Sequence, residues 1–124
     1  LSLHDALPIY FLIEKGMFLE AAQNLAWSDE VLKAAELLES HNLYDDAARY
    51  YERVSDWRKA EELYARSGDE KSIARLYEHK GDFPKAIQLW KKLGLPKQAE
   101  RCARKMDKNA QRSTEQSMQK ELNL

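Results

Sequence analysis

The chain has 124 residues, of which 44% are apolar and 33% charged, and its net charge is -1 at pH 7. This length suits one small domain or an array of short elements, and the balanced charge excludes a general electrostatic attraction to nucleic acid or to a membrane. The single cysteine, Cys102, excludes an internal disulfide and a cysteine-cluster metal site, and it favours a reducing, cytoplasmic location.

A repeat of thirteen residues organises the chain. Residues 56–94 consist of the consecutive segments "DWRKAEELYARSG", "DEKSIARLYEHKG" and "DFPKAIQLWKKLG", and the same period continues on both sides. It predicts helices near residues 8–15, 17–27, 30–40, 43–53, 57–66, 70–79, 83–92 and 96–106. The turns are so short that successive helices must pack antiparallel, with 26 residues per hairpin.

Each helix carries one packing stripe. A small residue recurs once per copy, and large apolar residues lie three residues before it and three or four after it, which places them on one helical face. The structural repeat positions are Ala21, Ala34, Ala47, Ala60, Ala86 and Ala99, with Leu63, Leu76 and Leu89. Helices of about ten residues are unstable alone. We therefore expect an all-α fold, an α-solenoid of about seven to eight short antiparallel helices.

The turns have their own signature. Gly68, Gly81 and Gly94 end three helices, as a left-handed C-cap requires. The corresponding residues of the earlier copies are Gly16, Asp29, Asn42 and Ser55, of which only Ser55 is a type that rarely adopts this conformation. In the clearest copies the next residue is an aspartate, at positions 56, 69 and 82, and it is predicted to cap the following helix by accepting a backbone N–H bond.

Motifs for catalysis are missing from the sequence. No HExxH, CxxC, GxGxxG or GxxxxGK[ST] pattern occurs. Cys102 occupies a leucine position of its copy, and His79 lies in the last turn of a helix, so both are interpreted as structural. We predict a chain that is not an enzyme and that holds no cofactor and no metal.

Aromatic and charged residues suggest where a partner could bind. Trp57 and Trp90 fall on packing positions, whereas Trp27 does not and is a better surface candidate. Residues 14–56 carry ten acidic and four basic residues, and residues 84–112 carry two acidic and nine basic residues. The candidate partner-binding residues are Trp27, Lys91, Lys92, Lys97, Arg101, Arg104 and Lys105. The basic segment is either a solvated closing helix or a docking patch for an acidic partner or a phosphate backbone.

The segment "KAEELYARSGD" resembles the tetratricopeptide class of helical repeats. Ala60, Leu63, Tyr64 and Gly68 stand at positions similar to that family's small and aromatic packing positions. Tetratricopeptide units span 34 residues, whereas two copies here span 26. Similar short arrays also occur in clathrin-type and intraflagellar-transport α-solenoids and near the C-termini of some large superfamily-1 helicases. The resemblance implies a protein-interaction scaffold that is one part of a larger chain.

Two function hypotheses remain open on the sequence. The first is a non-catalytic scaffold that binds protein partners, as the C-terminal part of a larger repeat protein. The alternative is an accessory C-terminal array of a nucleic-acid motor, with its basic end on nucleic acid. A membrane partner is not expected, since the longest apolar run, "YFLI" at residues 10–13, is far shorter than the roughly 20 residues of a membrane span.

The two ends of the chain depart from the repeat. Residues 1–9, "LSLHDALPI", resemble a translated sequencing adapter, and Pro8 stands where other copies have a small or apolar residue. We expect residues 1–9 to be non-native, residues 10–106 to form the repeat array, and residues 107–124 to be a polar tail, either a frayed helix or disordered. The apolar residues 10–13 at the start of the array are a candidate site of self-association.

Overall fold

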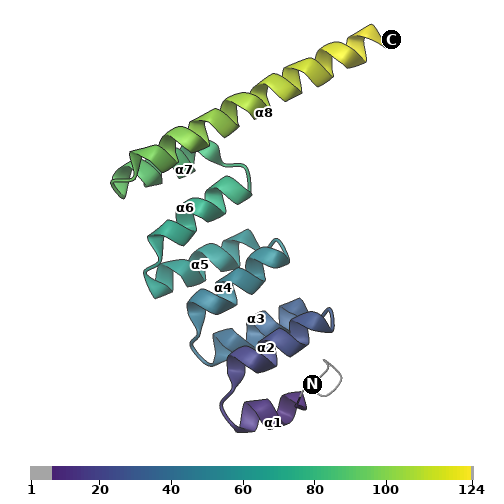
Figure 1. Cartoon of the computed structure of the whole chain (residues 1–124), viewed down its shortest axis with the longest axis vertical. Helices are drawn as coiled ribbons and strands as arrows, with labels where there is room; N and C mark the ends of the chain where they lie inside the picture. Colours follow the sequence, from purple (N-terminus) through teal and green to yellow (C-terminus); the bar gives the residue numbers. More distant parts are fainter. Residues whose placement is uncertain (1–6, 124) are drawn as a thin grey trace. The chain divides into compact units, whose positions relative to one another are not determined.

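Eight helices account for most of residues 7–123, which are the residues that the computed structural model describes (Figure 1). The helices are α1 (Ile9–Glu14), α2 (Phe18–Trp27), α3 (Val31–Ser40), α4 (Tyr44–Arg53), α5 (Trp57–Ser67), α6 (Glu70–His79), α7 (Phe83–Lys92) and α8 (Pro96–Leu122). Residues 7–123 contain no strand. Residues 1–6, with His4 and Asp5, and residue 124 lie outside the described part, so the prediction of a non-native start stays a prediction.

The chain divides into two units at Asp69. Unit 1 contains α1–α5, and unit 2, from Glu70 onward, contains α6–α8. Within each unit every helix packs against the next one in sequence. The prediction of an all-α α-solenoid is confirmed.

Small residues allow the helices to approach closely. The repeat alanines of α2, α3, α4, α5 and α7 are completely buried, and Ala99 of α8 is 3% exposed. In α2, α3 and α4 a second alanine follows directly and is also completely buried, so two sides of each helix lie close to a neighbour. Leu63 and Leu76 are fully buried beside them, whereas Leu89 is half-buried.

Helix α6 presents a different face from the one that the repeat predicts. Ile73 stands in the alanine position but is only half-buried, and the adjacent Ser72 and Ala74 are buried instead. The two small residues lie where α6 approaches its neighbour most closely, and the bulkier isoleucine lies beside that contact. Ala74 then packs with Ala86, Trp90 and Cys102 in the core of unit 2.

All seven turns end the preceding helix in the same way. One residue in each turn has a positive φ, from 60° at Ser55 to 87° at Gly81. In the turn after α4, the N–H of Ser55 donates to the carbonyl of Glu52 at 2.9 Å and that of Asp56 to Tyr51 at 3.0 Å, and the other turns repeat this pair of bonds. These are the two bonds of a Schellman motif, which satisfies the last carbonyls of the helix.

The aspartates after the turns differ from one another. Asp56 accepts a hydrogen bond from the backbone N–H of Lys59 at 3.2 Å, so the predicted cap is confirmed there. Asp82 makes no cap bond and instead pairs with Lys85 at 3.6 Å, so the same prediction is wrong for Asp82. An aspartate at the cap position can therefore form an ion pair with a nearby lysine instead of a hydrogen bond to the backbone of the helix.

Ser55→Gly is expected to stabilise the chain by about 1 kcal/mol. Serine at a φ of 60° carries the steric cost of a left-handed backbone, and glycine removes it. Urea unfolding followed by circular dichroism measures the difference. The converse change, Gly81→Ser, serves as the control and should lower stability by a similar amount, since no atom lies within 4 Å of an added Cβ and only the backbone cost remains.

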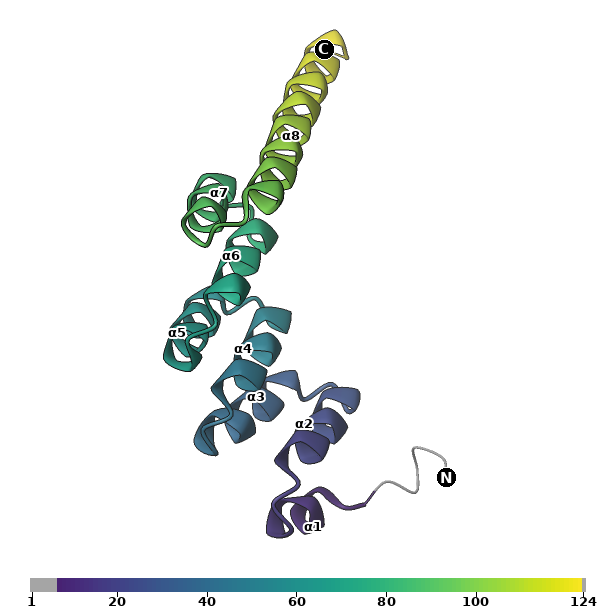
Figure 2. The ribbon, with the colours of Figure 1, turned by 60° about the vertical axis from the view of Figure 1, so that its left-hand side comes forward.

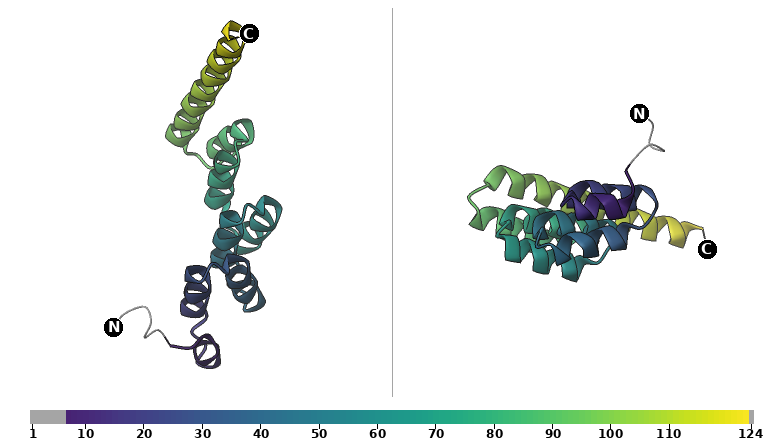
Figure 3. Two further views of the ribbon diagram at one scale, coloured as in Figure 1. Left: turned by 90° about the vertical axis from the view of Figure 1, so that its right-hand side faces the viewer. Right: turned by 90° about the horizontal axis from the view of Figure 1, so that it is seen from below.

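The last helix is much longer than predicted. Helix α8 continues without a break to Leu122, so the expected end near residue 106 is wrong (Figures 2 and 3). Residues 107–122 contain no glycine or proline and are rich in Gln, Lys, Arg and Glu, so nothing in the sequence ends the helix. Ala99 and Cys102 are buried at its start, whereas every residue from Asp107 to Asn123 is exposed. The predicted polar tail is thus helical as far as Leu122.

Candidate functional site

A hydrogen bond between an aromatic side chain and a glutamate recurs between successive helices. The hydroxyl of Tyr51 donates to Glu39 at 2.6 Å, and that of Tyr64 donates to Glu52 at 2.5 Å. In unit 2 the indole Nε1 of Trp90 donates to Glu78 at 2.6 Å. Donor and acceptor are twelve residues apart in all three pairs. The three aromatic residues are at most 4% exposed, so their polar tips need such an acceptor.

Two of these glutamates also reach a third helix. Glu39 of α3 accepts from Lys59 of α5 at 2.7 Å. Glu78 of α6 accepts from Arg101 at 2.9 Å and from Lys105 at 3.4 Å, both on α8, and its side chain is only 8% exposed. We call Glu39 and Glu78 the bridging glutamates, because each carboxylate joins three successive helices of its unit.

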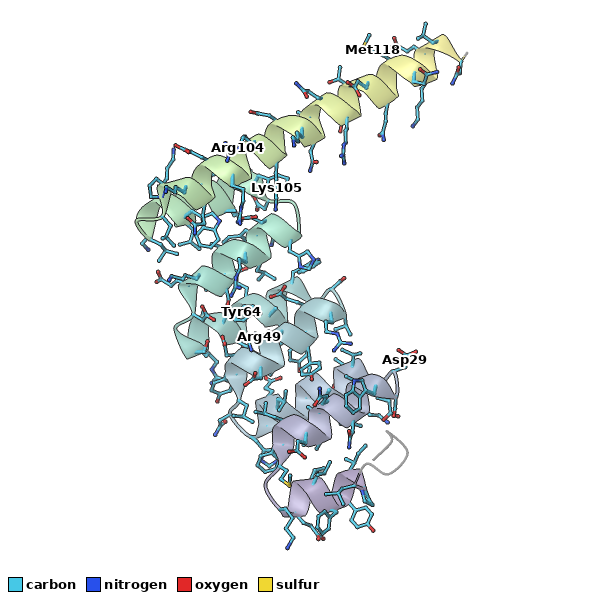
Figure 4. All side chains as sticks on the ribbon, viewed as in Figure 1. Asp29, Arg49, Tyr64, Arg104, Lys105 and Met118 are labelled. Atoms are coloured by element: carbon cyan, nitrogen blue, oxygen red, sulfur yellow. The ribbon has the colours of Figure 1, made fainter. Side chains whose placement is uncertain are left out.

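Burial and these bonds shift the pKa values of the groups involved. Burial and the neighbouring carboxylates raise the pKa values of the Tyr51 and Tyr64 hydroxyls, which therefore remain donors. Figure 4 shows Tyr64 close to Arg49, whose positive charge works against that rise. Burial alone would raise the pKa of Glu39, but hydrogen bonds from Lys59 and Tyr51 outweigh it and lower the pKa.

Glu39→Gln is expected to reduce the acid sensitivity of folding. Because the pKa of Glu39 is lowered in the folded state, its ionised form stabilises the fold above about pH 4, and this contribution is lost as the pH falls through the lowered pKa. The loss of stability between neutral pH and about pH 3 should thus be smaller in the variant than in the parent chain. Melting temperatures across this range measure it, and Glu36→Gln, exposed on the same helix, should leave it unchanged.

The candidate basic residues fall into two groups. Arg101 and Lys105 are engaged by Glu78, which the sequence analysis did not foresee. Lys97 and Arg104 are exposed, and together with Lys108 they lie on one face of α8, opposite the buried Ala99 and Cys102. Lys91 and Lys92 are exposed in the last turn of α7. The basic surface of unit 2 consists of Lys91, Lys92, Lys97, Arg104 and Lys108.

Unit 1 exposes an aromatic residue among acidic ones. Trp27 is 58% exposed at the end of α2, and Glu20 and Gln23 are exposed on the same helical face. Asp29 projects from the turn that follows (Figure 4). We call these four residues the Trp27 face.

The apolar segment at residues 10–13 is largely covered. Tyr10 is 70% exposed, but Leu12 is 1% exposed, and Phe11 and Ile13 are half-buried. Only one of the four side chains is therefore available for the self-association predicted for this segment.

A comparison with protein families decides which family this chain resembles. The model of the family described as "Soluble NSF attachment protein, SNAP" matches residues 2–114. The chain belongs to the SNAP family. This is a helical-repeat family of adaptors with tetratricopeptide-like architecture, so the prediction of a helical-repeat protein from a protein-binding family is confirmed. Comparisons with curated proteins and with solved structures gave no match.

Reactive groups are few in this member of the SNAP family. Within residues 7–123, no three His, Cys, Asp or Glu side chains are grouped so that they could hold a metal ion. Burial and then the charge of Glu78 raise the pKa of the Cys102 thiol, which disfavours the reactive thiolate. None of the described helices combines the length and apolar character needed to cross a membrane.

Sequence reasoning missed the pairs of glutamate and aromatic side chains in this SNAP-family chain. Glu39, Glu52 and Glu78 follow one residue after the last packing position of their copies, and an aromatic residue stands twelve residues further on. This spacing is readable in the sequence, but it was not part of the apolar pattern that defined the repeat.

Proposed function

We propose that this chain is a non-catalytic adaptor that attaches a protein partner, and that the partner is NSF, as the family name states. The match of the family model over residues 2–114 carries the proposal. A cytoplasmic location, favoured by the single cysteine, forms part of it.

The basic surface of unit 2 is the proposed contact for an acidic partner surface. Its five cations are exposed and lie on α7 and on one face of α8. Arg101 and Lys105, which were predicted to contribute, are partly neutralised by Glu78 and should contribute less. Opposite charges at the solvent-exposed edge of an interface chiefly raise the association rate and make this rate depend on salt.

Binding of purified NSF to the immobilised chain tests the proposal. Lys97→Glu with Arg104→Glu is expected to weaken binding about tenfold, mainly through slower association at low salt. Lys71→Glu with Lys120→Glu changes the net charge equally at exposed sites of unit 2 outside the basic surface, and this control should bind as the parent chain does. Absence of NSF binding by the parent chain would overturn the proposal, and equal weakening by both variants would remove the basic surface from it.

The alternative, an accessory array of a nucleic-acid motor, draws support from the same exposed stripe of cations on α8. Fluorescence anisotropy with labelled single strands at low and high salt tests it. Strong, salt-sensitive binding that Lys97→Glu with Arg104→Glu abolishes would favour the alternative. The pairing of Arg101 and Lys105 with Glu78 reduces the number of cations available to phosphates.

A further inference from the structure

The two units carry opposite charge. Over the described residues, unit 1 has thirteen acidic and seven basic residues, and unit 2 has seven acidic and thirteen basic residues. The net charge of -1 for the whole chain therefore conceals two strong and nearly equal charges of opposite sign. Such a distribution favours contact between unlike units of separate molecules.

The acidic unit offers a face suited to cations. On the Trp27 face, Glu20 and Trp27 lie seven residues apart on one side of α2, which is about 10 Å along the helix axis. Asp29 extends the face into the next turn. An exposed indole between carboxylates can hold a Lys or Arg side chain by a cation–π contact and an ion pair together.

The basic unit offers a face of matching size. Lys97, Arg104 and Lys108 follow one side of α8 over about 16 Å. These three cations lie on the far side of the helix from the buried Ala99, so the core of unit 2 does not engage them. Two exposed helix faces with complementary charge and similar length can therefore pack against each other.

We propose that the chain associates with a second copy of itself head to tail, with the Trp27 face of one molecule on the basic surface of unit 2 of the other. A second copy is the occupant that the charges favour, because the same chain carries both complementary faces. The contact is heterologous, joining two different patches, so a bound pair still has one free Trp27 face and one free basic surface, on different molecules. This inference does not depend on NSF as the partner.

The association should be weak and sensitive to salt. Exposed ion pairs contribute little individually, and salt screens them over about 8 Å at physiological ionic strength. Sedimentation velocity of the purified chain, over about 5 to 300 µM and at about 20 mM salt, is expected to show a sedimentation coefficient that rises with concentration. At about 500 mM salt the chain should sediment as a monomer.

Charge reversal on either face separates this proposal from other modes of association. The first variant, Lys97→Glu with Arg104→Glu, loses the basic face. The second variant, Glu20→Lys with Gln23→Lys, loses the acidic face. Each is expected to be monomeric alone, and their equimolar mixture should form dimers, because the first keeps an intact Trp27 face and the second an intact basic surface. Lys71→Glu with Lys120→Glu is the matched control and should associate as the parent chain does.

The outcomes are distinct. A parent chain that remains monomeric at low salt and high concentration overturns the proposal, as does a mixture of the two variants that remains monomeric while the parent associates. Association that persists at high salt or in the first variant would indicate a different, apolar contact and would also overturn it. Trp27→Ala tests the indole, and at least a tenfold weaker association is expected. Far-ultraviolet circular dichroism verifies that each variant is folded.

Discussion

Glu78→Ala is expected to lower the free energy of unfolding by about 2 kcal/mol. The change removes the acceptor of the Trp90 indole N–H. Because Trp90 is only 3% exposed, this N–H is left buried without its acceptor. It also removes the ion pairs to Arg101 and Lys105. These cations are 49% and 55% exposed, so solvent screening leaves their pairs only a minor share.

Urea unfolding measured by circular dichroism tests the effect of Glu78. Glu78→Gln keeps an acceptor for Trp90 but not the charge, so it should lie between the parent chain and Glu78→Ala. Glu100→Ala removes an exposed carboxylate of α8 and should change stability by less than about 0.5 kcal/mol. Equal stability of Glu78→Ala and Glu100→Ala would show that the bridge does not hold the three helices of unit 2 together.

Ala60→Leu is expected to destabilise the chain by about 2 kcal/mol through overpacking. Ala60 is completely buried on α5, one turn before Leu63 and Tyr64, which are also buried. Three added carbon atoms have no space there unless α5 moves away from α4, against which it packs.

A second alanine of the same helix supplies the control. Ala65 is exposed, so Ala65→Leu makes the same chemical change on the solvent side and should leave the melting temperature almost unaltered. If both substitutions had the same effect, the assignment of the buried stripe on α5 would be wrong.

The sequence predicted the helices well because the apolar repeat and the turns are local signals. The packing position and the left-handed turn position each recur every thirteen residues. Together they were sufficient to locate seven helices to within about two residues at either end. Ser55 adopted the left-handed conformation of its copies although its type does not favour it, because the Schellman bonds of its turn are the same as theirs.

The remaining features depend on contacts that a local pattern does not contain. Which face of α6 is buried depends on residue size: the smaller Ser72 and Ala74 fit the close contact with the neighbouring helix better than Ile73 does. The role of Glu78 requires Trp90, Arg101 and Lys105 to meet from two other helices. For the candidate surfaces, exposure of Trp27 could be inferred from its position off the stripe, but the division of the cations between an internal bridge and a free face could not.

The length of α8 gives one helix two different energetic regimes. Its first turns are held by the core of unit 2, whereas Met118, in its distal part, is 58% exposed (Figure 4). Backbone amides there have only the intrinsic stability of a solvated helix, which is marginal for a segment of this length. Amide protons from Asp107 onward should therefore exchange with deuterated solvent orders of magnitude faster than those near Cys102, although both belong to one continuous helix. The distal turns form a segment that opens and recloses while the packed array stays folded.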